Sequence, residues 1–190
     1  MRCVLCQSLS FRGICKNCIK KLLREEKHTR ILPNNLKVYS FFSYDSIAPI
    51  LHVKHHFFGH RVLKQIAKIT FAKFASDFTF PNTVYAIAID DDISSGYAHT
   101  AILTNALKSA SIKPLYRALR AKNKVKYSGK SFEFRRKNPR RFSLHVKGGI
   151  DAILVDDIIT SGQTLKEAHE CLTNAGINVL FALTLADAKA

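Results

Sequence analysis

The chain has 190 residues, of which 47% are hydrophobic, enough to bury one moderate core and a small appendage. No apolar run approaches the roughly 20 residues that cross a bilayer, and the N-terminus lacks the apolar core and cleavage site of a signal peptide. We therefore expect a soluble, cytoplasmic protein rather than a membrane-spanning one. Lys and Arg (30) exceed Asp and Glu (14) by 16, a surplus that favours a polyanionic partner over a neutral one.

The chain opens with a cysteine-rich head. Residues 19–27 (IKKLLREEK) place their apolar side chains on one side, which predicts a short helix that docks the head onto the main domain. The Pro-Asn-Asn sequence that starts at Pro33 interrupts this pattern. We expect a head of residues 1–32 and a main domain of residues 33–190.

The main domain alternates short apolar runs with helical patterns. This alternation predicts βαβ units and a parallel sheet flanked by helices on both faces, an α/β fold. The predicted strands are 38–44, 84–89, 150–155 and 177–186, and the predicted helices are 61–76, 97–110 and about 164–174, with Gly176 ending the last helix.

The head contains four cysteines, Cys3, Cys6, Cys15 and Cys18, in the spacing C-x2-C-x8-C-x2-C. Four thiolates in two close pairs suit tetrahedral Zn²⁺, whereas the tight spacing and a reducing cytosol disfavour the rival reading of two disulfides. Because four sulfur ligands leave no position for a reacting water, the predicted zinc ribbon is structural. The fifth cysteine, Cys171, is expected to lie in the core.

Four histidines, at positions 52, 55, 56 and 60, include pairs at the helical i, i+4 spacing. They lack a neighbouring carboxylate and are interspersed with Lys54 and Arg61, so we do not expect a second metal site there.

The most informative segment is residues 153–164, ILVDDIITSGQT. An apolar strand, two carboxylates and a small turn that opens a helix would aim backbone N–H groups and the positive end of the helix dipole at an anion. The acidic pair suits ribose hydroxyls or a bridging Mg²⁺, although one of these residues could simply cap the helix. The candidate phosphate-binding residues are Asp156, Asp157, Thr160, Ser161, Gly162, Gln163 and Thr164.

This segment resembles the phosphoribosyl-pyrophosphate signature of type I phosphoribosyltransferases. The resemblance implies that Asp156 and Asp157 contact the ribose, with Mg²⁺ as cofactor, and that residues 160–164 hold the 5′-phosphate. Together with the four-cysteine head, further elements over nearly the whole chain resemble the ComF competence family. These elements are Lys54 with Phe58-Gly59, and Arg135, Asn138 and Phe142 in a basic stretch.

One loop departs from the family pattern. ComF relatives carry a basic Arg-Gly-Phe-Asn-Gln-like loop after the central strand, but the corresponding residues 90–99 here begin with three aspartates and have Ser95 where arginine is expected. Three carboxylates would repel a pyrophosphate unless Mg²⁺ intervenes. We therefore expect weak ribosyl transfer or none, and no catalytic residue can be named.

Residues 113–147 hold 13 basic residues and one acidic residue, interleaved with Tyr and Phe. We expect residues 113–149 to form an extended basic insertion. Its composition suits single-stranded DNA, because the basic side chains can bind the phosphates while the bases stack on the aromatic rings. Phe132 and Phe134 could equally belong to the core. The candidate DNA-binding residues are Arg117, Arg120, Lys122, Lys124, Lys126, Lys130, Arg135, Arg136, Arg140 and Arg141.

The resemblance and the charge together predict a protein that binds and handles single-stranded DNA in the cytoplasm during natural transformation. Its partners would be single-stranded DNA, a ribose-phosphate ligand and, transiently at the inner membrane, the DNA channel or a DNA-processing protein. The alternative is an active phosphoribosyltransferase that acts on a nucleobase. An RNA-binding or ribosome-associated zinc protein would share the charge but would have no use for the phosphate loop.

Overall fold

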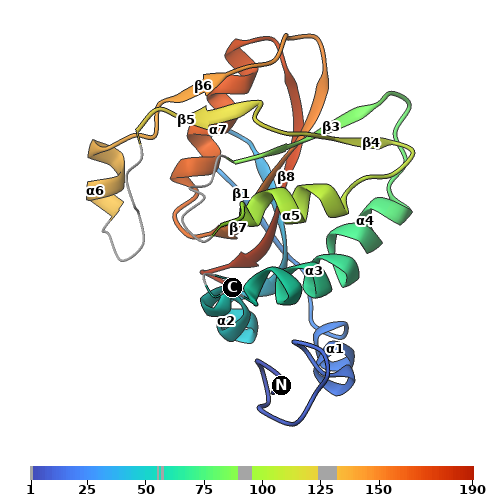
Figure 1. The fold of residues 1–190 in the computed structure, drawn as a ribbon. Coiled ribbons are helices and arrows are strands. Elements are labelled where there is room, and N and C mark those ends of the chain that lie inside the picture. Colours follow the sequence, from blue (N-terminus) through green and yellow to red (C-terminus); the bar gives the residue numbers. More distant parts are fainter. Residues whose placement is uncertain (1, 55, 57, 90–95, 124–131) are drawn as a thin grey trace.

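The computed structural model describes residues 2–54, 56, 58–89, 96–123 and 132–190. Its centre is a six-stranded sheet in the order β1-β2-β8-β7-β3-β4 (Figure 1). Neighbouring strands are parallel except β1 and β2, which form an antiparallel hairpin at one edge. The predicted α/β class is therefore confirmed. The strands are β1 (His28–Ile31), β2 (Lys37–Ser43), β3 (Val84–Ala88), β4 (Ile112–Leu115), β7 (Asp151–Ile159) and β8 (Asn178–Asp187).

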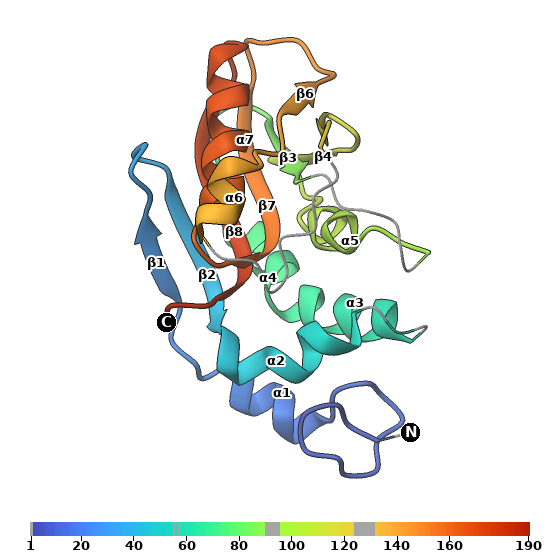
Figure 2. The same cartoon turned by 90° about the vertical axis from the view of Figure 1, so that its left-hand side faces the viewer.

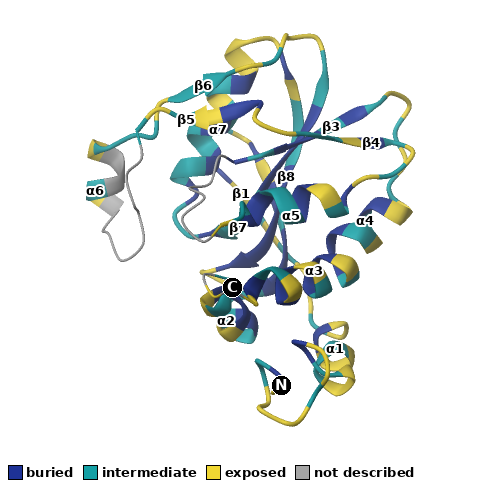
Figure 3. Ribbon diagram, viewed as in Figure 1, coloured by how far each residue is buried: buried dark blue, intermediate teal, exposed yellow. Residues whose placement is uncertain are grey.

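Helices cover both faces of this sheet (Figure 2). Successive β7 residues alternate between two cores: Ile153 and Val155 pack beneath one helical layer, and Ala152 and Leu154 pack beneath the other. The central strands are accordingly buried, and the exposed residues gather on the outer helix surfaces (Figure 3). Within the described ranges, no helix has the length and hydropathy that a bilayer span requires. One layer contains α2 (Tyr44–Val53), α3 (Gly59–Ile69), α4 (Phe71–Asp77) and α5 (His99–Ala106), and the other contains α7 (Gln163–Asn174).

The helix predicted at 61–76 is in fact two helices, α3 and α4, that meet at Thr70. The backbone of Thr70 leaves the helical region, with φ −115° and ψ −85°. Its hydroxyl donates to the carbonyl of Ile66 at 2.8 Å, a bond back to the preceding turn that commonly bends a helix. The bend places fully buried Phe71 beside Phe41, with ring centroids 4.9 Å apart.

The stretch 113–149 is more regular than its sequence predicts. Its start belongs to β4, the edge strand of the main sheet, and β5 (Leu119–Ala121) pairs with β6 (Phe142–Leu144) in a separate two-stranded hairpin. A short helix, α6 (Phe132–Lys137), lies between these two strands in the chain. Each strand is only three or four residues long, too short for a periodic pattern to be recognised.

The cysteine-rich head lies against α3, and its helix α1 (Lys16–Leu22) starts and ends earlier than the predicted 19–27. Gln65 of α3 accepts a hydrogen bond from the Ile14 N–H at 2.9 Å and donates one to the Ile14 carbonyl at 2.6 Å. A side chain at Gly13 would lie 2.6 Å from a Val62 methyl group, so the backbones approach closely here. The head therefore docks through its backbone as well as through α1.

The segment that leads from the head to the main domain is also ordered. β1, which the sequence assigns to the head, forms the edge of the main sheet, and its register pairs His28 with Ser40 and Ile31 with Lys37. The predicted boundary near residue 32 thus falls at the tip of a hairpin.

Candidate functional site

The predicted phosphate loop lies where β7 ends and α7 begins. β7 extends four residues beyond the predicted 150–155 run, because its parallel ladder with β8 continues to the pair Ile159–Asp187. Residues 160–162 form the turn, and α7 starts at Gln163. The acidic pair therefore lies inside the strand rather than after it.

This placement separates the two carboxylates. The two aspartates have different surroundings, so they do not act as one equivalent pair. Asp157 is 7% exposed and forms an ion pair with Lys54, which follows α2. Asp156 is partly exposed, and its Oδ1 accepts the Asp157 N–H at 2.8 Å. The protein itself compensates the charge of Asp157, and Asp156 is the more accessible carboxylate.

Lys54 is held in place by residues at and just before the start of α5. Its carbonyl accepts hydrogen bonds from the Tyr97 hydroxyl and, at 2.9 Å, from Nε2 of buried His99. Gly59 lies so close to the Val53 carbonyl that a side chain there would collide with it. Sequence reasoning noted Lys54 and Gly59 by family resemblance but missed the roles of Tyr97 and His99. No local pattern could have revealed them, since 43 and 45 residues separate them from Lys54.

The turn itself is built around Gly162, which has φ +80° and precedes the first residue of α7. A Cβ at this position would also lie 2.5 Å from a Leu32 methyl group. The Ser161 hydroxyl accepts the Gln163 N–H at 3.4 Å, whereas the N–H groups of Thr164 and Leu165 have no acceptor within the described part of the chain. Unpaired N–H groups at the start of a helix are suited to an anion.

Arg30 of β1, which the sequence analysis missed, also holds the turn in place. Its Nη1 donates to the Thr160 carbonyl at 2.6 Å, and its Nη2 forms an ion pair with buried Asp187 at the end of β8. Partial burial lowers the pKa of Arg30, but a guanidinium stays charged at neutral pH. Arg30 therefore holds the turn against the ends of β1 and β8, while its charge is balanced by Asp187.

A bridge through α7 connects the turn to the basic insertion. Gln163 donates its side-chain amide to Glu167 Oε1 at 2.9 Å, and Glu167 Oε2 accepts the backbone N–H of Arg140 at 2.8 Å. The hairpin continues from there, since the Lys122 and Asn123 N–H groups donate to the carbonyls of Arg141 and Arg140. The phosphate turn and the basic hairpin are thus held by one helix.

The candidate DNA-binding residues are spread along this hairpin. Arg117, Arg120, Lys122 and Arg141 are exposed, and Arg140 is half-buried. Arg135 and Arg136 lie on α6, whereas Lys124, Lys126 and Lys130 fall outside the described residues, as do Asp90–Asp92 and Ser95 of the acidic loop. The described arginines therefore share one segment beside α7.

The four cysteines of the head form a cluster that could hold a metal ion. All four sulfur atoms lie within 4.8 Å of one another, and the Cys6 and Cys15 sulfurs are 3.7 Å apart. Tetrahedral zinc with Zn–S bonds of about 2.3 Å implies S···S distances of roughly 3.8 Å, so the sulfur positions fit that ion. Cys171, in contrast, lies on α7, where its thiol faces the Phe142 carbonyl at 3.7 Å.

The surroundings of the cluster favour a thiolate at one position and oppose it at another. Hydrogen bonds from the Ser8 hydroxyl and amide lower the pKa of Cys6 to about 6. Burial raises the pKa of Cys18 well above its usual value. A bound cation would have to displace the proton from Cys18, as cations do when they bind thiolates.

No protein-family model and no curated protein matches this chain. Among solved structures, it is similar to the adenine phosphoribosyltransferases of Saccharomyces cerevisiae (17% identity, TM-score 0.44, 92% of this chain and 90% of that one) and Rhodothermus marinus (17%, 0.43, 91% and 88%). A third similar structure is the hypoxanthine phosphoribosyltransferase of Staphylococcus aureus (18%, 0.41, 66% and 62%). All three are phosphoribosyltransferases.

The chain spans 22% of the Leishmania donovani UMP synthase, to which it is also similar. The α/β assignment rests on the strand order and strand directions given above, since these structures share fewer than one residue in five with this chain.

Proposed function

We propose that this chain binds a ribose-linked phosphate at the turn after β7 and holds single-stranded DNA on the neighbouring basic hairpin. The bridge from Gln163 through Glu167 to the backbone of Arg140 carries the proposal, because it joins the two anion-binding elements on one helix. Such a protein would handle DNA that enters the cytoplasm during natural transformation. It would then meet the inner-membrane DNA channel or a DNA-processing protein only transiently.

The phosphate half of the proposal is supported by the chemistry of the turn. A phosphate placed before α7 would receive the open N–H groups of Thr164 and Leu165 and hydroxyl donors from the turn. Mg²⁺ usually binds through one or two carboxylates together with the phosphates of its ligand. Asp156 is the carboxylate that would hold it, since it is the more exposed of the two aspartates.

The DNA half is supported by charge and by the aromatic residues interleaved with it. Between residues 113 and 147 a single acidic residue accompanies 13 basic ones, and Tyr and Phe residues are interspersed among them. Basic side chains bind the phosphates of single-stranded DNA, and each base that stacks on an aromatic ring contributes ~1 to 3 kcal/mol. Neither interaction requires a particular DNA sequence.

The experiment that tests both halves is a titration of a fluorescent single strand, with and without phosphoribosyl pyrophosphate and Mg²⁺. We expect DNA to bind in both conditions, and phosphoribosyl pyrophosphate to bind at the turn with little nucleotide formed from it. The variant Thr164→Val should weaken binding of phosphoribosyl pyrophosphate and leave DNA affinity unchanged, because it removes a hydroxyl donor from the first turn of α7 and does not touch the hairpin.

Two results would contradict the proposal. If the protein binds single-stranded DNA no more tightly than it binds an uncharged polymer, the proposed DNA function is wrong. Nucleotide formation from phosphoribosyl pyrophosphate and a common base at an ordinary enzymatic turnover would favour the transferase alternative instead.

A further inference from the structure

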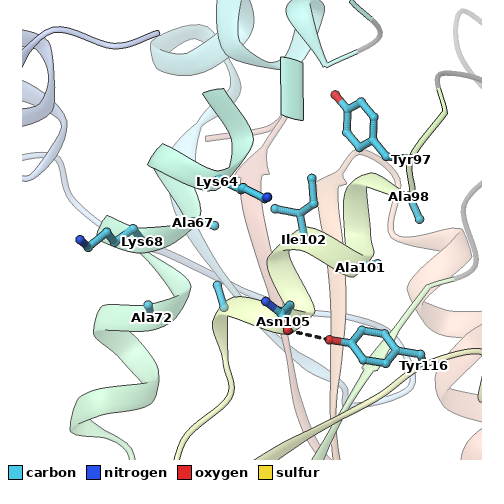
Figure 4. Close-up of a pocket in the computed structure, with 11 residues that line it drawn as sticks. Lys64, Ala67, Lys68, Ala72, Tyr97, Ala98, Ala101, Ile102, Asn105 and Tyr116 are labelled. Atoms are coloured by element: carbon cyan, nitrogen blue, oxygen red, sulfur yellow. Dashed lines mark hydrogen bonds between the residues drawn. The ribbon is translucent and has the colours of Figure 1, made fainter. Parts of the chain in front are cut away.

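A hollow of about 500 Å³ lies among the helices on the face of the sheet opposite α7. Figure 4 shows the residues that line it. It is bounded by α3, α4 and α5 and by the segment that follows β4. Its volume falls in the range of roughly 300 to 1,000 Å³ that is typical of small-molecule sites. Neither the phosphate turn nor the basic hairpin beside α7 contributes a residue to it.

Five of the eleven residues that line the hollow are alanines. Ala67 of α3 is buried, whereas Ala98 and the outward-facing Ala101 and Ala106 are partly exposed to the space. A methyl group leaves room where longer side chains would close the gap between two helices, and it presents no polar atom. Ile102 adds the largest apolar surface. The walls therefore suit a flat, apolar body.

The mouth of the hollow carries a fixed aromatic ring. The Tyr116 hydroxyl donates to Asn105 Oδ1 at 2.9 Å, which holds the ring beside α5 (Figure 4). Partial burial raises the pKa of Tyr116, so its phenol remains neutral under physiological conditions. An aromatic face at this place offers a stacking partner to a second ring.

The charged side chains at the hollow are two lysines, Lys64 and Lys68. Lys64 extends from α3 toward Ile102 across the opening, and Lys68 runs along the outer side of α3 (Figure 4). Among the described residues, no Asp or Glu lines the space, and neither lysine has a carboxylate within 4.0 Å. An ammonium group beside apolar walls attracts an anion that is attached to an apolar body.

From these contacts we propose that the hollow is a binding site for a small molecule with a planar ring system and one carboxylate or phosphate group. The ring lies between the alanines of α3 and α5 and the Tyr116 ring, and the anion meets Lys64. The site is separate from the phosphate turn, so it stands or falls independently of the proposed DNA function.

The alanine methyl groups provide a direct test. The full chain, labelled with ¹³C at its alanine methyls, is titrated with 2-naphthoate and, in parallel, with uncharged 2-naphthamide, and methyl NMR spectra are recorded. We expect saturable shifts for Ala67, Ala98, Ala101 and Ala106, and none for Ala175 at the far end of α7. Shifts spread over alanines outside the hollow would overturn the proposal, as would shifts that depend on protein concentration without ligand.

Three variants separate the contributions of charge and space. Lys64→Gln should weaken naphthoate binding about three- to fivefold and leave naphthamide binding unchanged, because it removes one exposed cation. Lys16→Gln, an equivalent change on exposed α1, should alter neither. Ala101→Phe should abolish binding of both ligands by filling the space. Equal effects of Lys64→Gln and Lys16→Gln would overturn the proposal even if Ala101→Phe fails to fold.

Discussion

At the scale of single residues, Arg30 connects three parts of the chain that are far apart in sequence. It lies in β1, yet its guanidinium meets the carbonyl of Thr160 and the carboxylate of Asp187. Asp187 is 4% exposed, so its charge depends on this partner. The turn predicted to bind phosphate is therefore positioned by a side chain that precedes it by 130 residues.

We predict that Arg30→Ala lowers the free energy of unfolding by about 3 kcal/mol, because removing one member of a buried pair leaves the other charge uncompensated. Urea denaturation measures this loss. The matched change Lys73→Ala breaks an ion pair with Asp77 whose side chains are 68% and 62% exposed, and it should leave stability unchanged within error. Similar effects of the two variants would show that the Arg30–Asp187 pair does not stabilise the fold.

Gly162 is the second residue on which the turn depends. Gly162→Ala should destabilise the protein by about 1 to 3 kcal/mol and weaken phosphoribosyl pyrophosphate binding, because φ +80° is strained for alanine and the new methyl would press on Leu32. Gly176→Ala, with φ +75° and open space around it, is the control for strain alone. Thermal unfolding measures the stability of both variants, and titration measures their affinity for phosphoribosyl pyrophosphate. Identical behaviour would mean that the contact with Leu32 has no effect on the turn.

At the scale of elements, the head is a unit that its own apolar residues cannot stabilise. Of its apolar side chains, Ile14 and Leu22 are buried, while Leu9 and Phe11 are fully or largely exposed. A head with so small a core needs a metal or another covalent restraint, since structural zinc contributes an apparent ~10 to 16 kcal/mol in small fingers. The contact between Ile14 and Gln65 would then transmit this order to α3.

We predict that the purified chain contains one zinc ion, and that Cys15→Ser removes it and makes the first 20 or so residues sensitive to protease. Cys171→Ser is the control and should retain the metal. Zinc affinity should rise with pH above neutrality, because burial raises the pKa of Cys18 and the metal must displace its proton. Elemental analysis and limited proteolysis measure these outcomes. A fully metallated and resistant Cys15→Ser variant would contradict the zinc ribbon.

At the scale of the whole molecule, the surplus of 16 positive charges is unevenly distributed. The basic hairpin lies beside α7, whereas the last 43 residues, which include β7, α7 and β8, carry six acidic groups and two basic ones. Residues 113–147, with 13 basic groups and one acidic group, concentrate a positive potential at the hairpin despite the acidic groups of neighbouring α7. A polyanion should bind there rather than over the whole surface.

Salt dependence tests this location. If single-stranded DNA contacts about five cations, the log–log slope of affinity against salt should be about −3 to −4. Replacing Arg117, Arg120 and Lys122 with glutamine should reduce its magnitude by about 2, because each lost phosphate contact removes about 0.7. Replacing exposed Lys68, Lys73 and Lys108, on the other face of the sheet, should leave it unchanged. Equal reductions in the two variants would place the DNA elsewhere or nowhere in particular.

Much of the fold could be predicted because it depends on local patterns. The strands at 38–44, 84–89 and 177–186 were predicted to within about a residue at either end, since each is a short apolar run with clear turn signals. The break at Thr70 and the edge strand β4 were missed. The first depends on where Phe71 packs, and the second on a partner strand 28 residues away in the chain.

For the candidate site, too, local features could be predicted from the sequence and long-range contacts could not. Residue type and spacing alone identified the cysteine cluster, the turn at Gly162 and the basic stretch, because ligand chemistry, backbone freedom and charge are properties of the residues themselves. Only the tertiary structure revealed that Asp157 is buried and paired with Lys54, that Arg30 binds the carbonyl of Thr160, and that Glu167 connects the turn to the hairpin. These features depend on which distant segments become neighbours, which is decided when the strands pair and the helices pack.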